Sequence, residues 1–374
     1  MEYPRQITVI QGAAILISTI IGVGILPLPR FAVQAADTGA SLVTVLGIGL
    51  AFIGLSLITI LGMRFPNQTM IEYSEDILGK WLGRIGSVLI ISFFAILTAL
   101  ASREFGEVVI TAVLRRTPLE VTVIVMLLLA AVSTRNNLTV FAYIHHFYFP
   151  LVLAPALLIV VLSLKNANVL NLLPITGNNP QGMWTGLLTV SALFQGTFIF
   201  TVVIPGMRRP ERAMKAAFWG MAIASSLYLV IVMATVAVFG PEEVKLLLWP
   251  TLELARTTAL PAAILERLDA VFLIVWVTAV FTTLFSSYFL TVHSISKLFK
   301  LRDHKMFSIF ILPFVFVIAM IPQNVIELYR IIQFIGRTGL WITIAYPALL
   351  LTVAFIRNKR GDRREQQPVG KKTG

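Results

Sequence analysis

Two glycines one residue apart, Gly22 and Gly24, interrupt the first long apolar segment of the chain. The segment reads STIIGVGILPLPR from Ser18 to Arg30, so that two prolines follow within five residues of the second glycine. A break of this kind leaves backbone N–H and C=O groups without helical partners, and a membrane tolerates them only where protein or a water-filled cavity satisfies them. Half-helix N-termini attract carboxylates, whereas half-helix C-termini and freed carbonyls attract ammonium groups. The break therefore predicts a site for one small zwitterion, such as an amino acid.

A second interruption, SALFQGTFIF from Ser191 to Phe200, lies in the sixth apolar segment. Gly22 lies roughly 22 Å along the first helix, in a membrane core about 30 Å thick. The sixth helix enters from the opposite face, and Gly196 lies roughly 18 Å along it, so that both breaks fall at similar depth. Interrupted helices at corresponding positions of two inverted halves indicate a transporter-type binding site. The alternative is that the glycines serve only close helix packing, which is common in membranes.

The composition requires that most of the chain face lipid. Of 374 residues, 57% are hydrophobic and 13% charged, and the mean hydropathy is +0.87, whereas soluble domains carry about 25% charged residues. Long apolar runs without two-residue alternation predict helices rather than a barrel. We predict an all-α polytopic membrane protein with about ten transmembrane helices, at about 7–29, 41–63, 85–114, 119–134, 138–162, 184–205, 214–239, 268–297, 306–322 and 337–356.

Loop charges predict the orientation of these helices. Most of the 30 Lys and Arg residues fall in loops that share one side if the N- and C-termini are cytoplasmic, as the positive-inside rule requires. The net charge of +12 then reflects attraction to anionic membrane lipid, and we expect no nucleic-acid partner because no basic soluble domain is present. Residues 357–374 are predicted to be a disordered basic tail.

The first helix resembles a known family. QGAAILISTIIGVGILPLPR is similar to the first helix of the B subunits of bacterial spore germinant receptors, which belong to the amino acid–polyamine–organocation transporter superfamily. The resemblance runs over essentially the whole chain and includes the basic loop PGMRRPERAMK after the sixth helix. It implies a LeuT-like five-plus-five inverted repeat with helices 1 and 6 broken, here residues 1–165 and 184–356. It also implies a sensor of a small germinant, commonly an amino acid, beside A and C subunits in the spore inner membrane.

The resemblance also assigns site residues. Backbone amides at Gly22, Val23 and Gly24 match those that bind a carboxylate. Carbonyls at four positions match those that receive the amino group: Thr19, Ile20, Phe194 and Gln195. Gly196 is the glycine of the second break and belongs to the same site. Thr98 matches the wall supplied by the third helix, and hydroxyls near the middle of the eighth helix face the site, with Thr283 and Ser286 the leading candidates beside Thr282 and Ser287.

Relatives place a sodium ion, or a lysine in its stead, between the first, fifth and eighth helices. The fifth helix here has no lysine before Lys165, a departure that counts against ion coupling.

Further ionisable residues fall within the predicted helices, where such groups are functional candidates. Arg103 and Glu107 have i,i+4 spacing with Glu104 between them, and their depth favours an interfacial pair or vestibule lining over a proton relay. His145 and His146 favour a hydrogen-bonded packing role over a proton relay or a substitute for the missing lysine.

No pattern predicts an enzyme, a cofactor or a metal site. A ligand sensor is therefore the leading hypothesis, a secondary amino acid or amine transporter the next, and a structural scaffold the weakest.

Overall fold

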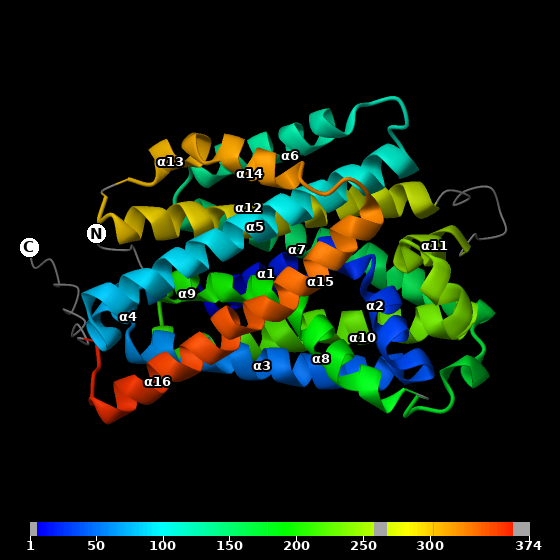
Figure 1. The fold of residues 1–374 in the computed structure, drawn as a ribbon, viewed down its shortest axis with the longest axis horizontal. Coiled ribbons are helices and arrows are strands. Elements are labelled where there is room, and N and C mark those ends of the chain that lie inside the picture. The colour runs from blue at the N-terminus through cyan, green and yellow to red at the C-terminus, as the bar shows by residue number, and fades with distance from the viewer. Residues whose placement is uncertain (1–5, 178, 258–267, 302, 362–374) are drawn as a thin grey trace, which may run out of the picture.

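The computed structural model describes residues 6–177, 179–257, 268–301 and 303–361, and these form a bundle of helices that run along its longest axis (Figure 1). Within these residues the backbone forms no strand, only an isolated bridge between Ile7 and Met207. The helices are α1 (Val9–Ile20), α2 (Leu28–Ala36), α3 (Ala40–Arg64), α4 (Met70–Leu78), α5 (Lys80–Ala112), α6 (Leu119–Thr134), α7 (Leu138–Ser163), α8 (Pro180–Ala192), α9 (Phe200–Val203), α10 (Ala213–Leu246), α11 (Pro250–Thr257), α12 (Leu268–Leu298), α13 (Lys305–Phe310), α14 (Leu312–Ala319), α15 (Val325–Leu340) and α16 (Tyr346–Ile356).

Local sequence sets several helix starts. The Thr8 hydroxyl accepts a hydrogen bond from the Gln11 amide, while the Gln11 side chain accepts one from the Thr8 amide at 2.9 Å. The Asn137 side chain likewise accepts from the amide of Val140 at 2.9 Å and begins α7. Such caps satisfy the amides that the first turn of a helix leaves without partners.

The helix inventory agrees with a multi-pass membrane protein. Among the described residues six helices are long and apolar enough to span a membrane, or seven if the bent pair Gln181–Ala192 and Gln195–Gly206 is one span. Three shorter apolar helices, Val9–Ile20, Leu119–Thr134 and Lys305–Ala319, lie where the other predicted spans were placed. A total of ten spans stays a prediction, because these three do not reach spanning length by themselves.

Both predicted breaks are present. α1 ends at Ile20, a 3₁₀ turn covers Val23–Ile25, and α2 begins beyond Pro27. The glycines tolerate the irregular backbone of the break, and Pro29 stands in the first turn of α2, where a missing N–H costs no helical hydrogen bond. In the second break α8 ends at Ala192, and a 3₁₀ segment Gln195–Ile199 continues after a bend of 40°.

The last predicted helix starts earlier than expected. Its prediction was 337–356, but α15 begins at Val325 and passes through a π-helical turn, Trp341–Ala345, into α16. Its first half carries Glu327, Arg330 and Arg337, which lower the hydropathy of the segment. The helix is stable there because its apolar face is buried in the bundle.

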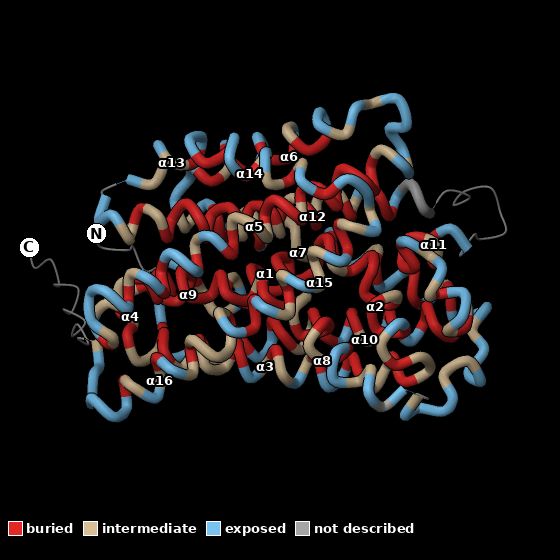
Figure 2. The backbone as a smooth tube through the Cα atoms, in the orientation of Figure 1, coloured by how far each residue is buried: buried red, intermediate tan, exposed pale blue. Residues whose placement is uncertain are grey.

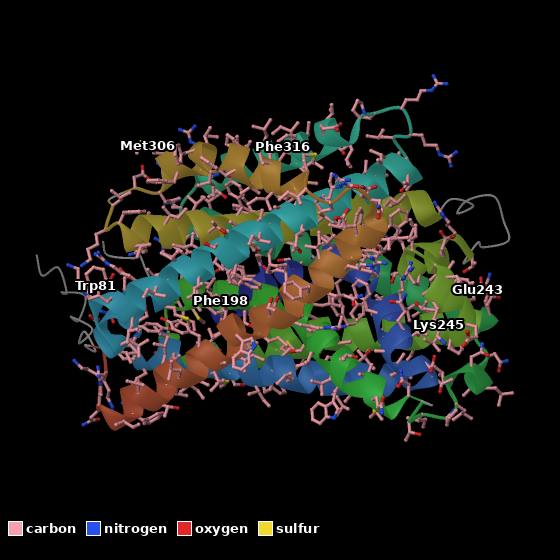
Figure 3. The ribbon with its side chains drawn as sticks, in the orientation of Figure 1. Trp81, Phe198, Glu243, Lys245, Met306 and Phe316 are labelled. Carbon is pink, nitrogen blue, oxygen red and sulfur yellow. The ribbon has the colours of Figure 1, made fainter. Side chains whose placement is uncertain are left out.

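Burial separates a central layer from a lipid-facing shell. α1 crosses the middle of the bundle and packs against α7, α10 and α12 (Figure 1), and its residues from Gly12 to Ile20 are buried (Figure 2). Figure 3 shows Trp81 and Met306 at the outside of the bundle, where they are 83% and 75% exposed. Phe198, in contrast, lies inside the bundle and is 1% exposed. Large apolar side chains on the outside are the expected surface of a protein whose solvent is lipid.

Segments in or next to the loops predicted to be cytoplasmic, which include 1–6, 64–84, 206–213, 298–305 and 357–374, bond to one another. Each contact joins segments far apart in the chain: Arg208 N to Ile7 O at 2.9 Å, Gly361 N to Arg64 O at 3.1 Å, and Lys297 Nζ to Glu72 Oε1 at 2.9 Å. Residues 362–374 of the predicted tail lie outside the described residues.

Candidate functional site

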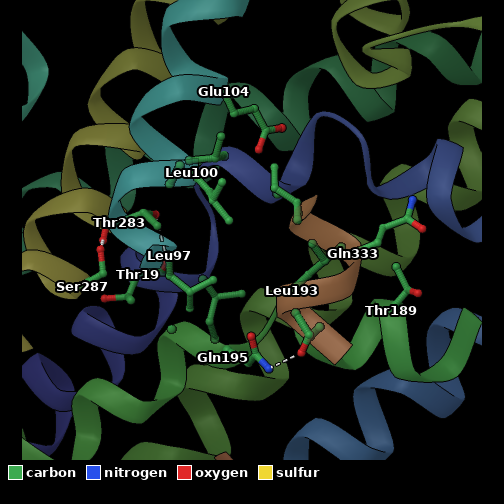
Figure 4. Close-up of a pocket in the computed structure, with 18 of the residues that line it drawn as sticks. Thr19, Leu97, Leu100, Glu104, Thr189, Leu193, Gln195, Thr283, Ser287 and Gln333 are labelled. Carbon is green, nitrogen blue, oxygen red and sulfur yellow. Dashed lines mark hydrogen bonds between the residues drawn. The ribbon is translucent and has the colours of Figure 1, made fainter. Parts of the chain in front are cut away.

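A cavity of about 120 Å³ lies between the two breaks (Figure 4). Its walls come from both ends of the first break, from the second break, and from α5, α12 and α15. The breaks touch one another there, because a Cβ atom added at Gly196 would lie 2.9 Å from Cγ2 of Thr19. The irregular backbone of the two breaks and the side chains of three regular helices thus line one small cavity.

Seven of the eleven residues predicted from sequence line this cavity. They are Thr19, Ile20, Val23, Gly24, Gln195, Gly196 and Thr283. The remaining four, Gly22, Thr98, Phe194 and Ser286, are not among the lining residues.

Each of these four residues contacts protein instead. The Thr98 hydroxyl donates to Ser287, a lining residue, at 2.9 Å, and the ring of Phe194 packs on Tyr228 with centroids 5.1 Å apart. The Gly22 carbonyl accepts from Trp276 Nε1 at 3.3 Å. The Ser286 hydroxyl lies 3.2 Å from Nε2 of His145 on α7 and 2.6 Å from Oγ1 of Thr19.

The carbonyls at the first break already accept hydrogen bonds from this chain. Thr283 Oγ1 donates to the Thr19 carbonyl at 2.9 Å, and Tyr228 OH donates to the Ile20 carbonyl at 2.5 Å. A carbonyl has two lone pairs, so each retains one acceptor position. The amides of Val23 and Gly24, in contrast, have no acceptor among the described residues. The break therefore offers two open donors to a carboxylate and carbonyls with one position left for an amine.

Gln195 presents a carbonyl oxygen at the second break. Its Nε2 donates to the Gly336 carbonyl at 2.7 Å, a contact drawn in Figure 4. This hydrogen bond sets the orientation of the side-chain amide. Its Oε1 is buried and has no partner in the described part of the chain. The sequence prediction invoked the backbone carbonyl of Gln195, and the structure adds its side chain.

The charged residues of α5 separate into a pair and a single carboxyl group. Arg103 Nη2 lies 2.8 Å from Glu107 Oε1, and both residues are buried. The i,i+4 pair is therefore formed, and its position at the membrane interface or in a vestibule stays a prediction. Glu104 lines the cavity instead. Adjacent helix positions point about 100° apart, which is why Arg103 and Glu104 belong to different environments.

Sequence reasoning predicted a wall from α5 but named Thr98, which does not line the cavity, and it missed the wall from α15. The α5 wall is formed by Leu97, Leu100, Ala101 and Glu104, and the α15 wall by Ile332, Gln333 and Gly336. The α5 residues have i, i+3, i+4, i+7 spacing, which places them on one helical face and was a signal available in the sequence. The α15 wall lies in a segment predicted as a loop, so its contribution was hidden.

A polar network behind the cavity joins α1, α7 and α12. His145 Nδ1 lies 2.5 Å from Ser18 Oγ, and His145 Nε2 lies 3.2 Å from Ser286 Oγ. Ser286 Oγ in turn lies 2.6 Å from Thr19 Oγ1, and Thr282 Oγ1 donates to the Ser18 carbonyl at 2.8 Å. His145 thus has a buried, hydrogen-bonded position, whereas His146 is exposed.

Comparison with known proteins places this geometry in a family. The family model for spore germination proteins matches residues 6–327, which is most of the chain. The chain belongs to the spore germination protein family. It is similar to spore germination protein YndE of Bacillus subtilis, with 28% identity over 96% of this chain and 98% of that protein. Spore germination protein A2 of Bacillus subtilis is 27% identical over 80% of this chain and 82% of its own length. Spore germination protein B2 of the same organism is 24% identical over 96% of this chain and 97% of its own length.

A solved structure gives the fold of this spore germination protein. The substrate-bound, outward-open state of a Na⁺-coupled sialic acid symporter superposes with a TM-score of 0.62, covering 91% of this chain and 79% of that one at 11% identity. At this identity the likeness concerns the fold alone. The LeuT-like architecture with broken first and sixth helices, which the resemblance implied, is therefore the fold of this chain.

Replacing Thr283 with alanine is expected to weaken ligand affinity by about two- to tenfold, the net worth of one hydrogen bond. Thr283 lines the cavity and its hydroxyl holds the Thr19 carbonyl in place. Binding titrations of the purified variant measure the effect. Ser286 was the other leading hydroxyl in the sequence, but it contacts His145 and does not line the cavity, so Ser286→Ala is expected to change the affinity by less than about twofold. Equal affinities for Thr283→Ala and the parent protein would remove Thr283 from the site.

Proposed function

We propose that this spore germination protein senses a small germinant, an amino acid or similar zwitterion, that binds between its two broken helices. The observation that carries the proposal is one cavity of about 120 Å³ lined by both breaks, with open amides at Val23 and Gly24. Cavities near this size hold molecules as small as benzene, so that the volume suits a small amino acid. The amides bind the carboxylate, and the Thr19 and Ile20 carbonyls receive the amine.

In this proposal the chain is the B subunit of a germinant receptor, beside A and C subunits in the spore inner membrane. Its halves, residues 1–165 and 184–356, form the inverted repeat, and both termini are cytoplasmic. Exposed basic residues on the loops 206–213 and 298–305, such as Arg208, Arg212 and Lys300, form the surfaces that couple to other subunits. A ligand that binds two conformations with different affinity changes what such a partner contacts.

A thermal-shift screen of the purified protein against the common amino acids tests the proposal. Saturable stabilisation by at least one of them is expected, because a ligand that binds only the folded state stabilises it. A screen in which no amino acid or related zwitterion stabilises the protein would refute the proposal. Gly22→Val serves as the negative control for any hit.

The alternative is a secondary amino acid or amine transporter, which the fold of the sialic acid symporter favours. A coupled transporter needs a second, ion-specific site. Between α1, α7 and α12 the hydroxyls of Ser18, Thr282 and Ser286 are already hydrogen bonded within the protein. We therefore expect proteoliposomes to bind the ligand without concentrating it under a sodium or proton gradient. Gradient-driven accumulation measured with radiolabelled ligand would favour the transporter.

A further inference from the structure

Glu104 is a buried carboxyl group that the proposed zwitterion does not use. It lies in the cavity wall, is 4% exposed, and its Oε1 has no hydrogen-bond partner among the described residues. Figure 4 shows its carboxyl group directed into the cavity from α5, on the opposite side from Gln195 in that view. Burying a carboxylate without a partner is costly, so a ligand cation that reaches this carboxyl group stabilises its charged form.

The neighbouring cation on α5 is already engaged. Arg103 forms its ion pair with Glu107, through Nη2 at 2.8 Å and through Nε at 3.0 Å, both to Oε1. Within the described residues no ion pair includes Glu104. A buried carboxyl group at the cavity is therefore left without a cation from this part of the chain.

A second buried side-chain atom in the cavity wall, Gln195 Oε1, is also a hydrogen-bond acceptor without a partner in the described residues. Gln195 Oε1 has no partner, because the amide is oriented by the donation of Nε2 to Gly336. Two buried acceptors in one cavity are positions for hydrogen-bond donors of a ligand, and one of the acceptors belongs to a carboxyl group. Leu97, Leu100 and Leu193 beside them provide an apolar surface for a short hydrocarbon chain.

We propose that the cavity selects a ligand that carries an ammonium group in addition to its amino-acid end, and that this ammonium group pairs with Glu104. The proposal rests on the proposed function and narrows its ligand from amino acids in general to small diamino acids. A charge-assisted hydrogen bond in a buried site is stronger than a neutral one. It discriminates against an isostere that places a methyl group at the same point, since that ligand leaves the carboxylate buried and unpaired.

Two pairs of probes of nearly equal shape test the proposal by calorimetric titration of the purified full-length protein. Diaminobutyrate is compared with norvaline, and ornithine with norleucine, because each pair differs by an ammonium group in place of a methyl group. We expect the wild-type protein to prefer the ammonium member of at least one pair by about tenfold or more. Glu104→Gln should lower this preference to within about threefold, while Glu120→Gln, which removes an exposed carboxylate at the start of α6, should retain it.

The outcomes separate this inference from the proposed function. Binding of norvaline or norleucine as tight as that of the ammonium members overturns the inference but leaves an amino-acid sensor intact, whereas no binding of any amino acid overturns the proposed function. If Glu104→Gln weakens the affinity for both members of a pair equally, Glu104 has a structural role and its role in ligand selection is overturned. An unchanged preference in Glu104→Gln also overturns its role in selection. If Glu104→Gln does not fold, the preference of the wild-type protein decides.

Discussion

Replacing Gly22 with valine is expected to abolish ligand binding while the protein still inserts into the membrane. A Cβ atom added at Gly22 would lie 2.7 Å from the Cβ of Thr283 and closer still to its Oγ1. Thr283 cannot retreat without releasing the Thr19 carbonyl, so the substitution displaces the first break from α12. Overpacking of this kind costs about 1–3 kcal/mol locally, and a β-branched side chain adds its own restriction. Thermal-shift titration with the screened ligand should show no saturable response.

Gly49→Val is the matched control, because a Cβ atom at Gly49 meets nothing within 4 Å and the residue is exposed on α3. Gly24→Val is expected to have a smaller effect than Gly22→Val, since its nearest neighbour is the flexible end of Leu193 at 3.2 Å. Gly196→Val should again prevent binding, because Thr19 lies 2.9 Å away. A well-expressed Gly22→Val protein with the parent's dose–response would remove the first break from the site.

Replacing His145 with alanine is expected to destabilise the protein by about 3 kcal/mol or more. His145 is fully buried, with Ser18 and Ser286 on its two ring nitrogens and the ring of Phe141 at a centroid distance of 4.3 Å. The substitution leaves a cavity and takes a hydrogen-bond partner from two buried hydroxyls, each of which is unfavourable. The melting temperature in detergent should fall well below that of the parent protein.

His146→Ala provides an internal control, because the adjacent histidine is exposed and its removal should change the melting temperature little. Ligand affinity should also weaken in His145→Ala, since Ser286 connects His145 to the hydroxyl of Thr19 in the cavity wall. Equal melting temperatures for the two variants would show that the network behind the cavity contributes nothing to stability.

The sequence by itself determined the features that depend on neighbouring residues. Apolar runs of spanning length predict helices in lipid, because a helix satisfies its own backbone within one segment. The breaks at Gly22 and Gly196 were predictable from local sequence, since glycine weakens a helix interior and two prolines follow the first break. The resemblance to a family rested on the same stretch, and it named seven residues that line the cavity.

Only the tertiary structure decided which side chains share that cavity. The pairing of Ser18 with His145 joins residues 127 positions apart, and no local pattern encodes the rotation of α7 that turns His145 inward and His146 outward. The rotation of α5 likewise places Glu107 within ion-pair distance of Arg103 and leaves Glu104 in the cavity wall. Helix rotation and packing distance follow from how all neighbouring surfaces fit together, so that the groups that select a ligand become visible only in the folded chain.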